Sequence, residues 1–140
     1  MSNKNSELHH LHVTAKAAAA RAHAPYSRFK VGAALVTDAG ELITGCNVEN
    51  VSYGLSNCAE RTAIFTAVAQ GIDLSKVKQV VIYTPSDQVY SPCGACRQVM
   101  AEFFHPHTEV ISTCDTGQQS WTVESLLPNA FHFDIEKYRV

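Results

Sequence analysis

Two short cysteine motifs, far apart in the chain, constrain the fold more than any other feature of this sequence. The first is Cys58-Ala59-Glu60, which places a thiol two positions before a carboxylate. The second is Pro92-Cys93-Gly94-Ala95-Cys96, in which two thiols at the i, i+3 spacing can face one ion from a turn or a helix start. If the three thiolates bind one metal ion, the fold must bring both segments to the same point.

This donor set favours a catalytic zinc site over a structural one. A structural site closes four tetrahedral positions with Cys or His, whereas a catalytic site keeps three protein ligands and leaves one position for water. Cys58, Cys93 and Cys96 supply three, and no other Cys or His has a paired spacing with Cys58. Zinc lowers the pKa of bound water to about 7, so Glu60 becomes the candidate proton shuttle.

Two arginines directly follow the motif residues, and we expect both to donate to the cysteine sulfurs. Three thiolates on a divalent cation leave a net negative charge, which Arg61 and Arg97 would partly neutralise. The sequences after both motifs predict helices, whose N-termini also favour thiolate.

The arrangement resembles the zinc-dependent cytidine deaminase family, whose marks are C-A-E and P-C-x-x-C. The likeness to its short, tetramer-forming members runs from Ala24-Pro25-Tyr26-Ser27 to Leu127-Pro128-Asn129-Ala130-Phe131, which is most of the chain. It implies one zinc ion per subunit and hydrolytic deamination of cytidine and 2′-deoxycytidine to the uridines plus ammonia, in pyrimidine salvage. In such a reaction Glu60 would protonate N3 of the base and the departing amine, and the backbone N–H of Ala59 would hold the O2 of the base.

Further residues are candidates for substrate binding. Asn47 and Glu49 lie on one face at a strand end, where an amide and a carboxylate suit a hydroxyl, and the resemblance assigns them to the ribose 3′-hydroxyl. A polar strand end in solvent is the alternative. Phe29 and Tyr53 would line the pocket by resemblance, although an aromatic residue in such segments is more often part of the core.

The resemblance also assigns a role to Phe131. In the short-form family, a phenylalanine in this L-L-P-x-A-F context packs on the base in the active site of an adjacent subunit. It therefore implies a homotetramer, whereas the sequence alone would place Phe131 in the core.

Length and composition limit the remaining possibilities. The 140 residues predict a single domain, residues 1–140, and a net charge of −2 argues against a nucleic-acid partner. We expect no membrane segment, because no apolar run is long enough. The N-terminus lacks the apolar region of a secretory signal, which predicts a cytoplasmic protein in which Cys46 and Cys114 are buried small hydrophobic residues.

The order of the expected elements predicts a mixed α/β sheet with helices on its faces, and the resemblance implies a three-layer α/β/α sandwich with a mixed five-stranded sheet. The expected helices are Glu7 to Ala22, Cys58 to Ala69, Gly94 to Phe104 and Thr122 to Leu127; the expected strands are Val31 to Thr37, Leu42 to Asn47, Val77 to Tyr83 and Glu109 to Cys114, with a turn at 116–119 and Trp121 in a short strand.

Two smaller expectations concern Gly32 and the three histidines near the start of the first expected helix. Gly32 is expected at a close backbone approach. His9, His10 and His12 are expected to be solvated or at most adventitious metal ligands.

Three other functions compete with cytidine deamination. A deaminase of another aminopyrimidine nucleoside, such as blasticidin S, would have a similar site, but that family lacks the acid at the position of Glu49. A structural zinc module would need a fourth ligand, such as Cys46, Cys114 or a histidine. A redox Cys-x-x-Cys pair would leave Cys58 and Glu60 unexplained.

Overall fold

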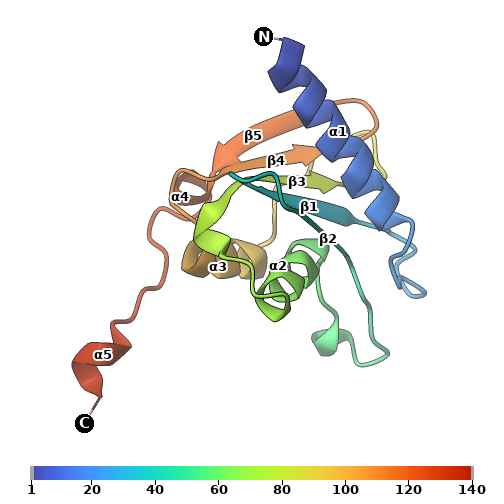
Figure 1. Ribbon diagram of the computed structural model, residues 1–140. Helices are drawn as coiled ribbons and strands as arrows, with labels where there is room; N and C mark the ends of the chain where they lie inside the picture. Colours follow the sequence, from blue (N-terminus) through green and yellow to red (C-terminus); the bar gives the residue numbers. More distant parts are fainter. Residues whose placement is uncertain (1, 140) are drawn as a thin grey trace.

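A five-stranded mixed sheet lies between two layers of helices in the computed structural model, which describes residues 2–139 (Figure 1). The strand order is β2-β1-β3-β4-β5. Only the β3–β4 pair is parallel; the other neighbouring strands are antiparallel. The strands are β1 Gly32–Thr37, β2 Leu42–Cys46, β3 Val77–Tyr83, β4 Glu109–Thr113 and β5 Gln118–Thr122.

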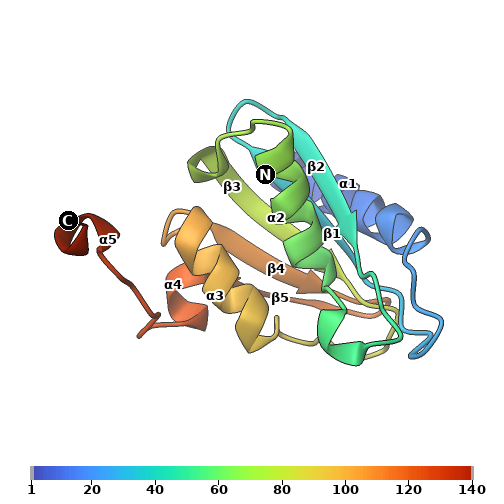
Figure 2. The same cartoon turned by 90° about the horizontal axis from the view of Figure 1, so that it is seen from below.

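One helix covers one face of the sheet, and the helices that follow the cysteine motifs cover the other. Figure 2 shows α2 and α3 side by side on the face opposite α1, with α4 next to α3. After α4 the chain extends away from the sheet and ends in α5 (Figures 1 and 2). The helices are α1 Ser2–Ala19, α2 Ala59–Ala69, α3 Gly94–Phe103, α4 Val123–Leu126 and α5 Ile135–Tyr138, with 3-10 turns η1 Tyr53–Leu55 and η2 Leu74–Lys76. This architecture confirms the predicted mixed sheet in a three-layer α/β/α sandwich.

Both faces of the sheet are buried, so the protein has two hydrophobic clusters. Alternate residues of a strand point to opposite faces. In β1, Ala33 and Leu35 therefore join the cluster under α2 and α3, whereas Ala34 and Val36 join the cluster under α1. The last four residues of β3 are buried alternately in the two clusters, which agrees with the predicted sheet with helices on its faces.

Two glycines allow helices to approach the sheet more closely than any side chain would permit. A Cβ added at Gly32 would lie 1.8 Å from the backbone oxygen of Ala15 in α1. One added at Gly45 would lie 2.4 Å from the backbone nitrogen of Ala63 in α2. The close approach predicted at Gly32 is confirmed, and Gly45 serves the same purpose on the opposite face.

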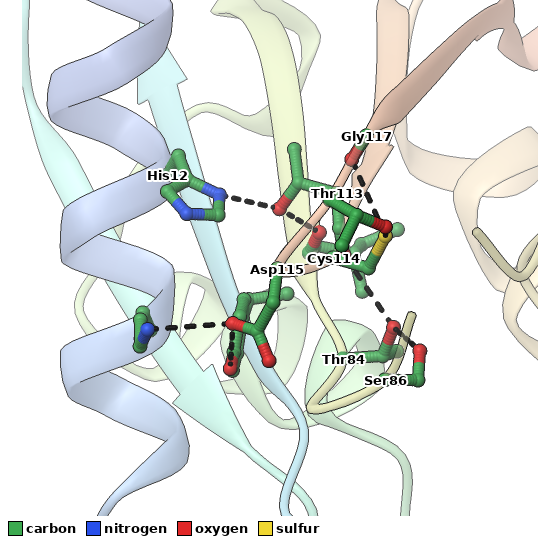
Figure 3. Close-up of polar contacts among 11 residues, drawn as sticks. His12, Thr84, Ser86, Thr113, Cys114, Asp115 and Gly117 are labelled. Atoms are coloured by element: carbon green, nitrogen blue, oxygen red, sulfur yellow. Dashed lines mark hydrogen bonds and ion pairs between the residues drawn. The ribbon is translucent and has the colours of Figure 1, made fainter. Parts of the chain in front are cut away.

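Polar contacts also attach α1 to the sheet (Figure 3). Nδ1 of His12 lies 2.8 Å from Oγ1 of Thr113, whose hydroxyl donates to the Ile82 carbonyl at 2.9 Å. Because the single hydroxyl proton of Thr113 is used in this way, the His12 Nδ1–H donates to Thr113. His9 and His10 are exposed as predicted, but the prediction that His12 is solvated is wrong, since half-burial and this bond fix its ring.

A second polar contact lies one helical turn further along α1 (Figure 3). The carboxylate of Asp115 accepts from the Tyr83 hydroxyl at 2.8 Å and pairs with Lys16 at 3.3 Å. Burial and the neighbouring carboxylate raise the pKa of Tyr83 to about 12. The same hydroxyl lowers the pKa of Asp115, so the bond joins a neutral phenol to an ionised acid.

The predicted boundaries are least accurate for the first helix, which runs from Ser2 to Ala19 rather than from Glu7 to Ala22. The helix ends earlier because the chain then pairs with the segment after β2. The His23 N–H donates to the Asn47 carbonyl at 3.0 Å, and the His23 carbonyl accepts from the Glu49 N–H at 2.7 Å.

The end of the sheet also differs from the prediction, because the expected turn at 116–119 includes the first residues of β5. The first three residues of β5 are exposed, and its sequence lacks the apolar–polar alternation that marks a half-buried strand. Trp121 lies in this strand and packs against the core. Cys114 is buried as predicted, and Cys46 is half-buried. Within residues 2–139, no helix is both long and apolar enough to cross a membrane.

Candidate active site

The starts of α2 and α3 bring three cysteine sulfurs together. Cys58 and Cys93 are the N-cap residues of the two helices, and Cys96 lies in the first turn of α3. The three sulfur atoms lie within 4.8 Å of one another, and those of Cys58 and Cys93 are 3.8 Å apart. Two sulfurs bound tetrahedrally to zinc at about 2.3 Å would be about 3.8 Å apart, so the spacing fits this ion.

The donor set leaves one tetrahedral position open. In the part of the chain that the structure describes, no fourth His, Cys or carboxylate ligand joins the three sulfurs. The fold therefore brings Cys58, Cys93 and Cys96 together as predicted. Among the described residues, neither Cys46, Cys114 nor a histidine completes a four-ligand structural site. The geometry fits one zinc ion per subunit.

Hydrogen bonds to sulfur make the site favourable for thiolate. Bonds from the Cys96 thiol, from Arg61 and from Cys93 lower the pKa of Cys58 to about 5. The Arg61 Nη2 lies 3.3 Å from the Cys58 sulfur. The pKa of Cys96 is raised, first by the hydrogen bond with Cys58 and then by burial. Zinc binds the thiolate form, so zinc binding would displace the proton of this hydrogen bond.

The prediction that Arg97 also donates to a cysteine sulfur is wrong. Its guanidinium donates to the Pro92 carbonyl at 2.7 Å, to the Leu126 carbonyl at 3.0 Å and to the Ser91 hydroxyl at 2.8 Å. Because these oxygens engage the guanidinium, Arg97 fastens the loop before α3 to the end of α4. Arg61 is the arginine that contacts a sulfur.

Glu60 lies in the first turn of α2 and is only 5% exposed. Burial raises the pKa of its carboxyl, and the neighbouring Cys58 thiolate raises it further. Ala59, at the first position of the same helix, is fully buried. The first N–H groups of a helix have no partner within it, so the Ala59 N–H is available to a ligand.

A cavity of about 380 Å³ adjoins this cluster. Cys58, Ala59, Glu60 and Cys93 line it, together with residues from the loops before β1, α2 and α3, from the segment after β2 and from the end of β3. Its acidic side chains are Glu49 and Glu60, and no Lys or Arg of residues 2–139 lines it. The cavity can therefore accommodate a neutral polar molecule next to the three cysteine sulfurs.

The structure brings most of the predicted substrate-binding residues to this cavity. Phe29, Asn47 and Glu49 line it. Tyr53 does not: it is 73% exposed and lines a neighbouring hollow of about 280 Å³, with its ring edge-on to Tyr26 at 5.6 Å. Tyr53 is the first residue of η1, a 3-10 turn in the segment before α2.

Phe131 lies outside the cavity and is 73% exposed, so it is not the core residue that the sequence alone would suggest. Its carbonyl accepts from the Gln98 side chain of α3 at 3.1 Å. Its ring stacks with that of Phe133, with 6.5 Å between the ring centres.

The cavity residues that were not predicted from the sequence include Tyr90 and Ser27. Tyr90 lines the cavity, and its ring meets Phe29 edge-on at 6.4 Å. The signal available in the sequence was an aromatic residue just before the Pro92-Cys93 motif, separated from it by Ser91. Ser27 also lines the cavity, and it contacts Glu49.

Comparisons with known proteins agree with this site. A family model described as the cytidine and deoxycytidylate deaminase zinc-binding region matches residues 5–113. The cytidine deaminase of Sporosarcina psychrophila is 48% identical over 117 residues, 83% of this chain and 85% of that protein. The cytidine deaminase of Mycobacterium tuberculosis (strain H37Rv) is 42% identical over 117 residues, 84% of each chain. The crystal structure of cytidine deaminase from Burkholderia pseudomallei matches with a TM-score of 0.85 and 50% identity, covering 88% of this chain and 98% of that one.

Proposed function

The chain belongs to the cytidine deaminase family, and from that premise we propose that it is a zinc-dependent enzyme that hydrolyses cytidine to uridine and ammonia. The observation that carries the proposal is a buried acid, Glu60, which lies two residues after Cys58 in the first turn of α2 and lines the same cavity as Cys58 and Cys93 of the three-sulfur donor set. The proposal includes 2′-deoxycytidine as a substrate and a role in pyrimidine salvage.

The chain's own residues have distinct tasks in this reaction. Cys58, Cys93 and Cys96 would hold the zinc ion, which would supply an acidified water as nucleophile at neutral pH. Glu60 accepts a proton from the attacking water and delivers it to N3 of the base; it then takes the remaining proton of the hydroxyl group added at C4 and passes it to the amine, which leaves as ammonia as the C4 carbonyl forms. The Ala59 N–H donates to O2 of the base, which fixes the ring with C4 toward the metal cluster.

The charge of the cavity supports a nucleoside rather than a nucleotide as the substrate. A phosphate group is normally bound by basic side chains. The cavity instead contains two acids and no Lys or Arg of the described chain. The same absence of basic residues disfavours nucleic acid as a substrate, and Glu49 at the cavity favours cytidine over blasticidin S.

We extend the proposal to the assembly of the protein. A homotetramer, with Phe131 contributed to a neighbouring active site, would account for a large aromatic side chain that lies outside its own chain's cavity and is mostly exposed. Sedimentation velocity would test the tetramer, and Phe131→Ala should then raise the KM for cytidine without loss of zinc. A cytoplasmic location is part of the same proposal.

The absorbance change of cytidine during incubation with the purified protein tests the proposed reaction. We expect conversion to uridine with stoichiometric ammonia, loss of activity with a zinc chelator and recovery with added zinc. Cytidine 5′-monophosphate and blasticidin S, assayed in parallel, should react far more slowly. Absence of ammonia release from cytidine, or a clear preference for either alternative compound, would contradict the proposal. A protein that binds zinc firmly but releases no ammonia from cytidine would favour a structural zinc module.

A further inference from the structure

The loop between α1 and β1 carries Phe29 to the cavity and contains an unfavourable backbone conformation. Arg28 has a φ of 59°, in the left-handed region that L residues with side chains seldom adopt. Such a conformation persists when the surrounding contacts determine it. Here those contacts come from two side chains beyond the end of β2, Asn47 and Glu49.

Glu49 uses most of its hydrogen-bonding capacity on this loop. Its Oε1 accepts from the backbone N–H groups of Tyr26 and Ser27, both at 3.1 Å. Its Oε2 accepts from the Ser27 hydroxyl. A carboxylate has about four lone-pair positions, so one position on Oε2 remains for a ligand. The Ser27 hydroxyl is also the main cause of the lowered pKa of Glu49, which therefore stays ionised.

Asn47 holds the other end of the same loop. Its Oδ1 accepts from the Val31 N–H at 2.8 Å, and its Nδ2 donates to the Phe29 carbonyl at 2.8 Å. One amide N–H of Asn47 remains. Together, the two residues thus have one donor and one acceptor left, which is what a single hydroxyl group needs.

Ser27 links the two parts of this arrangement. Its hydroxyl donates a hydrogen bond to Oε2 of Glu49, the oxygen with the remaining lone pair. Its Oγ accepts from the Phe29 N–H at 3.0 Å. Without this hydroxyl, Oε2 would lose its bond to the loop and the carboxylate could rotate about its remaining contacts at Oε1. Phe29 would keep the bond from its carbonyl to Asn47, so its position should change little.

We propose that Ser27 is a positioning residue that orients the Glu49 carboxylate toward a ribose hydroxyl, and so sets the preference of the enzyme for substrates that carry that hydroxyl. The inference rests on the proposed cytidine deaminase function. Ser27 acts through Glu49 and does not itself contact the sugar.

Steady-state kinetics on two substrates test this role. Cytidine carries the ribose hydroxyls, and 2′,3′-dideoxycytidine lacks them. Ser27→Ala should lower kcat/KM for cytidine about tenfold, mainly through KM, because a hydrogen bond to a charged group is lost. For 2′,3′-dideoxycytidine the change should stay within about twofold. Ser27→Thr, which keeps a hydroxyl, should restore most of the activity on cytidine.

A double-mutant cycle separates action through Glu49 from direct contact with the sugar. In a Glu49→Ala background, Ser27→Ala should change kcat/KM for cytidine by less than about twofold. A full tenfold loss in that background, an equal loss on both substrates, or no loss on cytidine would each overturn the inference while the wild-type enzyme remains active. A wild-type protein that releases no ammonia from cytidine would instead overturn the proposed function, and this inference with it.

Discussion

Gly45→Ala should move α2, the helix whose start carries Cys58 and Glu60, away from the sheet on which it packs. A Cβ at this position would lie 2.4 Å from the Ala63 nitrogen, 2.6 Å from the Ala59 oxygen and 2.9 Å from the Ala63 Cα. All three atoms belong to the backbone of α2, so no side-chain rotation can relieve the overlap. Restoring an ordinary contact distance requires a shift of α2 by roughly 1 Å.

The magnitude follows from that shift. Overpacking in a core commonly costs about 1–3 kcal/mol, and a clash with three backbone atoms belongs at the upper end, so we expect the free energy of unfolding to fall by about 3 kcal/mol. Because Cys58 and Glu60 lie at the start of α2, the same shift misplaces them, and a misplacement of about 1 Å can lower a rate about 100-fold.

Urea unfolding, the zinc content and ammonia release from cytidine would measure these effects together. Gly54→Ala is a matched control, because a Cβ at Gly54 would meet nothing within 4 Å. It should change the free energy of unfolding by less than about 0.5 kcal/mol. A Gly45→Ala protein with the stability and activity of this control would refute the argument that α2 is positioned by close approach to β2.

Two further predictions concern the metal cluster and α1. Arg61→Gln removes the donor to the Cys58 sulfur and should weaken zinc binding about 10–100-fold in a chelator competition assay, whereas Arg97→Gln should bind zinc nearly as wild type; equal weakening would contradict the assignment. Burial and neighbouring positive charges lower the pKa of His12 in the folded protein. As the pH falls through about 6.5, His12 therefore takes up a proton in the unfolded chain before it does so in the folded protein. The free energy of unfolding should thus be highest above that pH and decline below it. In urea unfolding at pH 7.5 and 5.5, His12→Gln, whose amide can still donate to Thr113, should show a smaller decline than wild type; parallel pH dependences would contradict this reasoning.

The sequence predicted those parts of the fold that local signals determine. The apolar run from Val77 to Tyr83 matches β3 at both ends, and the two cysteine motifs mark the starts of α2 and α3. The Gly-containing segment Asp38-Ala39-Gly40 forms the turn that joins β1 to β2, with Gly40 at a φ of 86°. In each case the residues that carry the signal also form the element.

The predictions failed where a residue's partner is distant in the sequence. His12 contacts Thr113, and Arg97 contacts Leu126, and neither partner can be inferred from helical periodicity. The exposed residues of β5 carry no periodic pattern, because pairing with β4 determines that strand. The hydrogen bonds of Asn47 to the loop before β1 are of the same kind, since the sequence indicated a polar strand end but not the backbone that it holds.

Glu60→Gln provides the most direct test of the central claim, that a buried acid beside a three-sulfur zinc site moves the proton in cytidine deamination. Zinc content and ammonia release from cytidine should be measured on the same preparation of wild-type and variant protein. We predict one zinc per subunit in both, with kcat lowered by at least about 1,000-fold in the variant. A variant that keeps its zinc and turns over cytidine at a near wild-type rate would contradict the account.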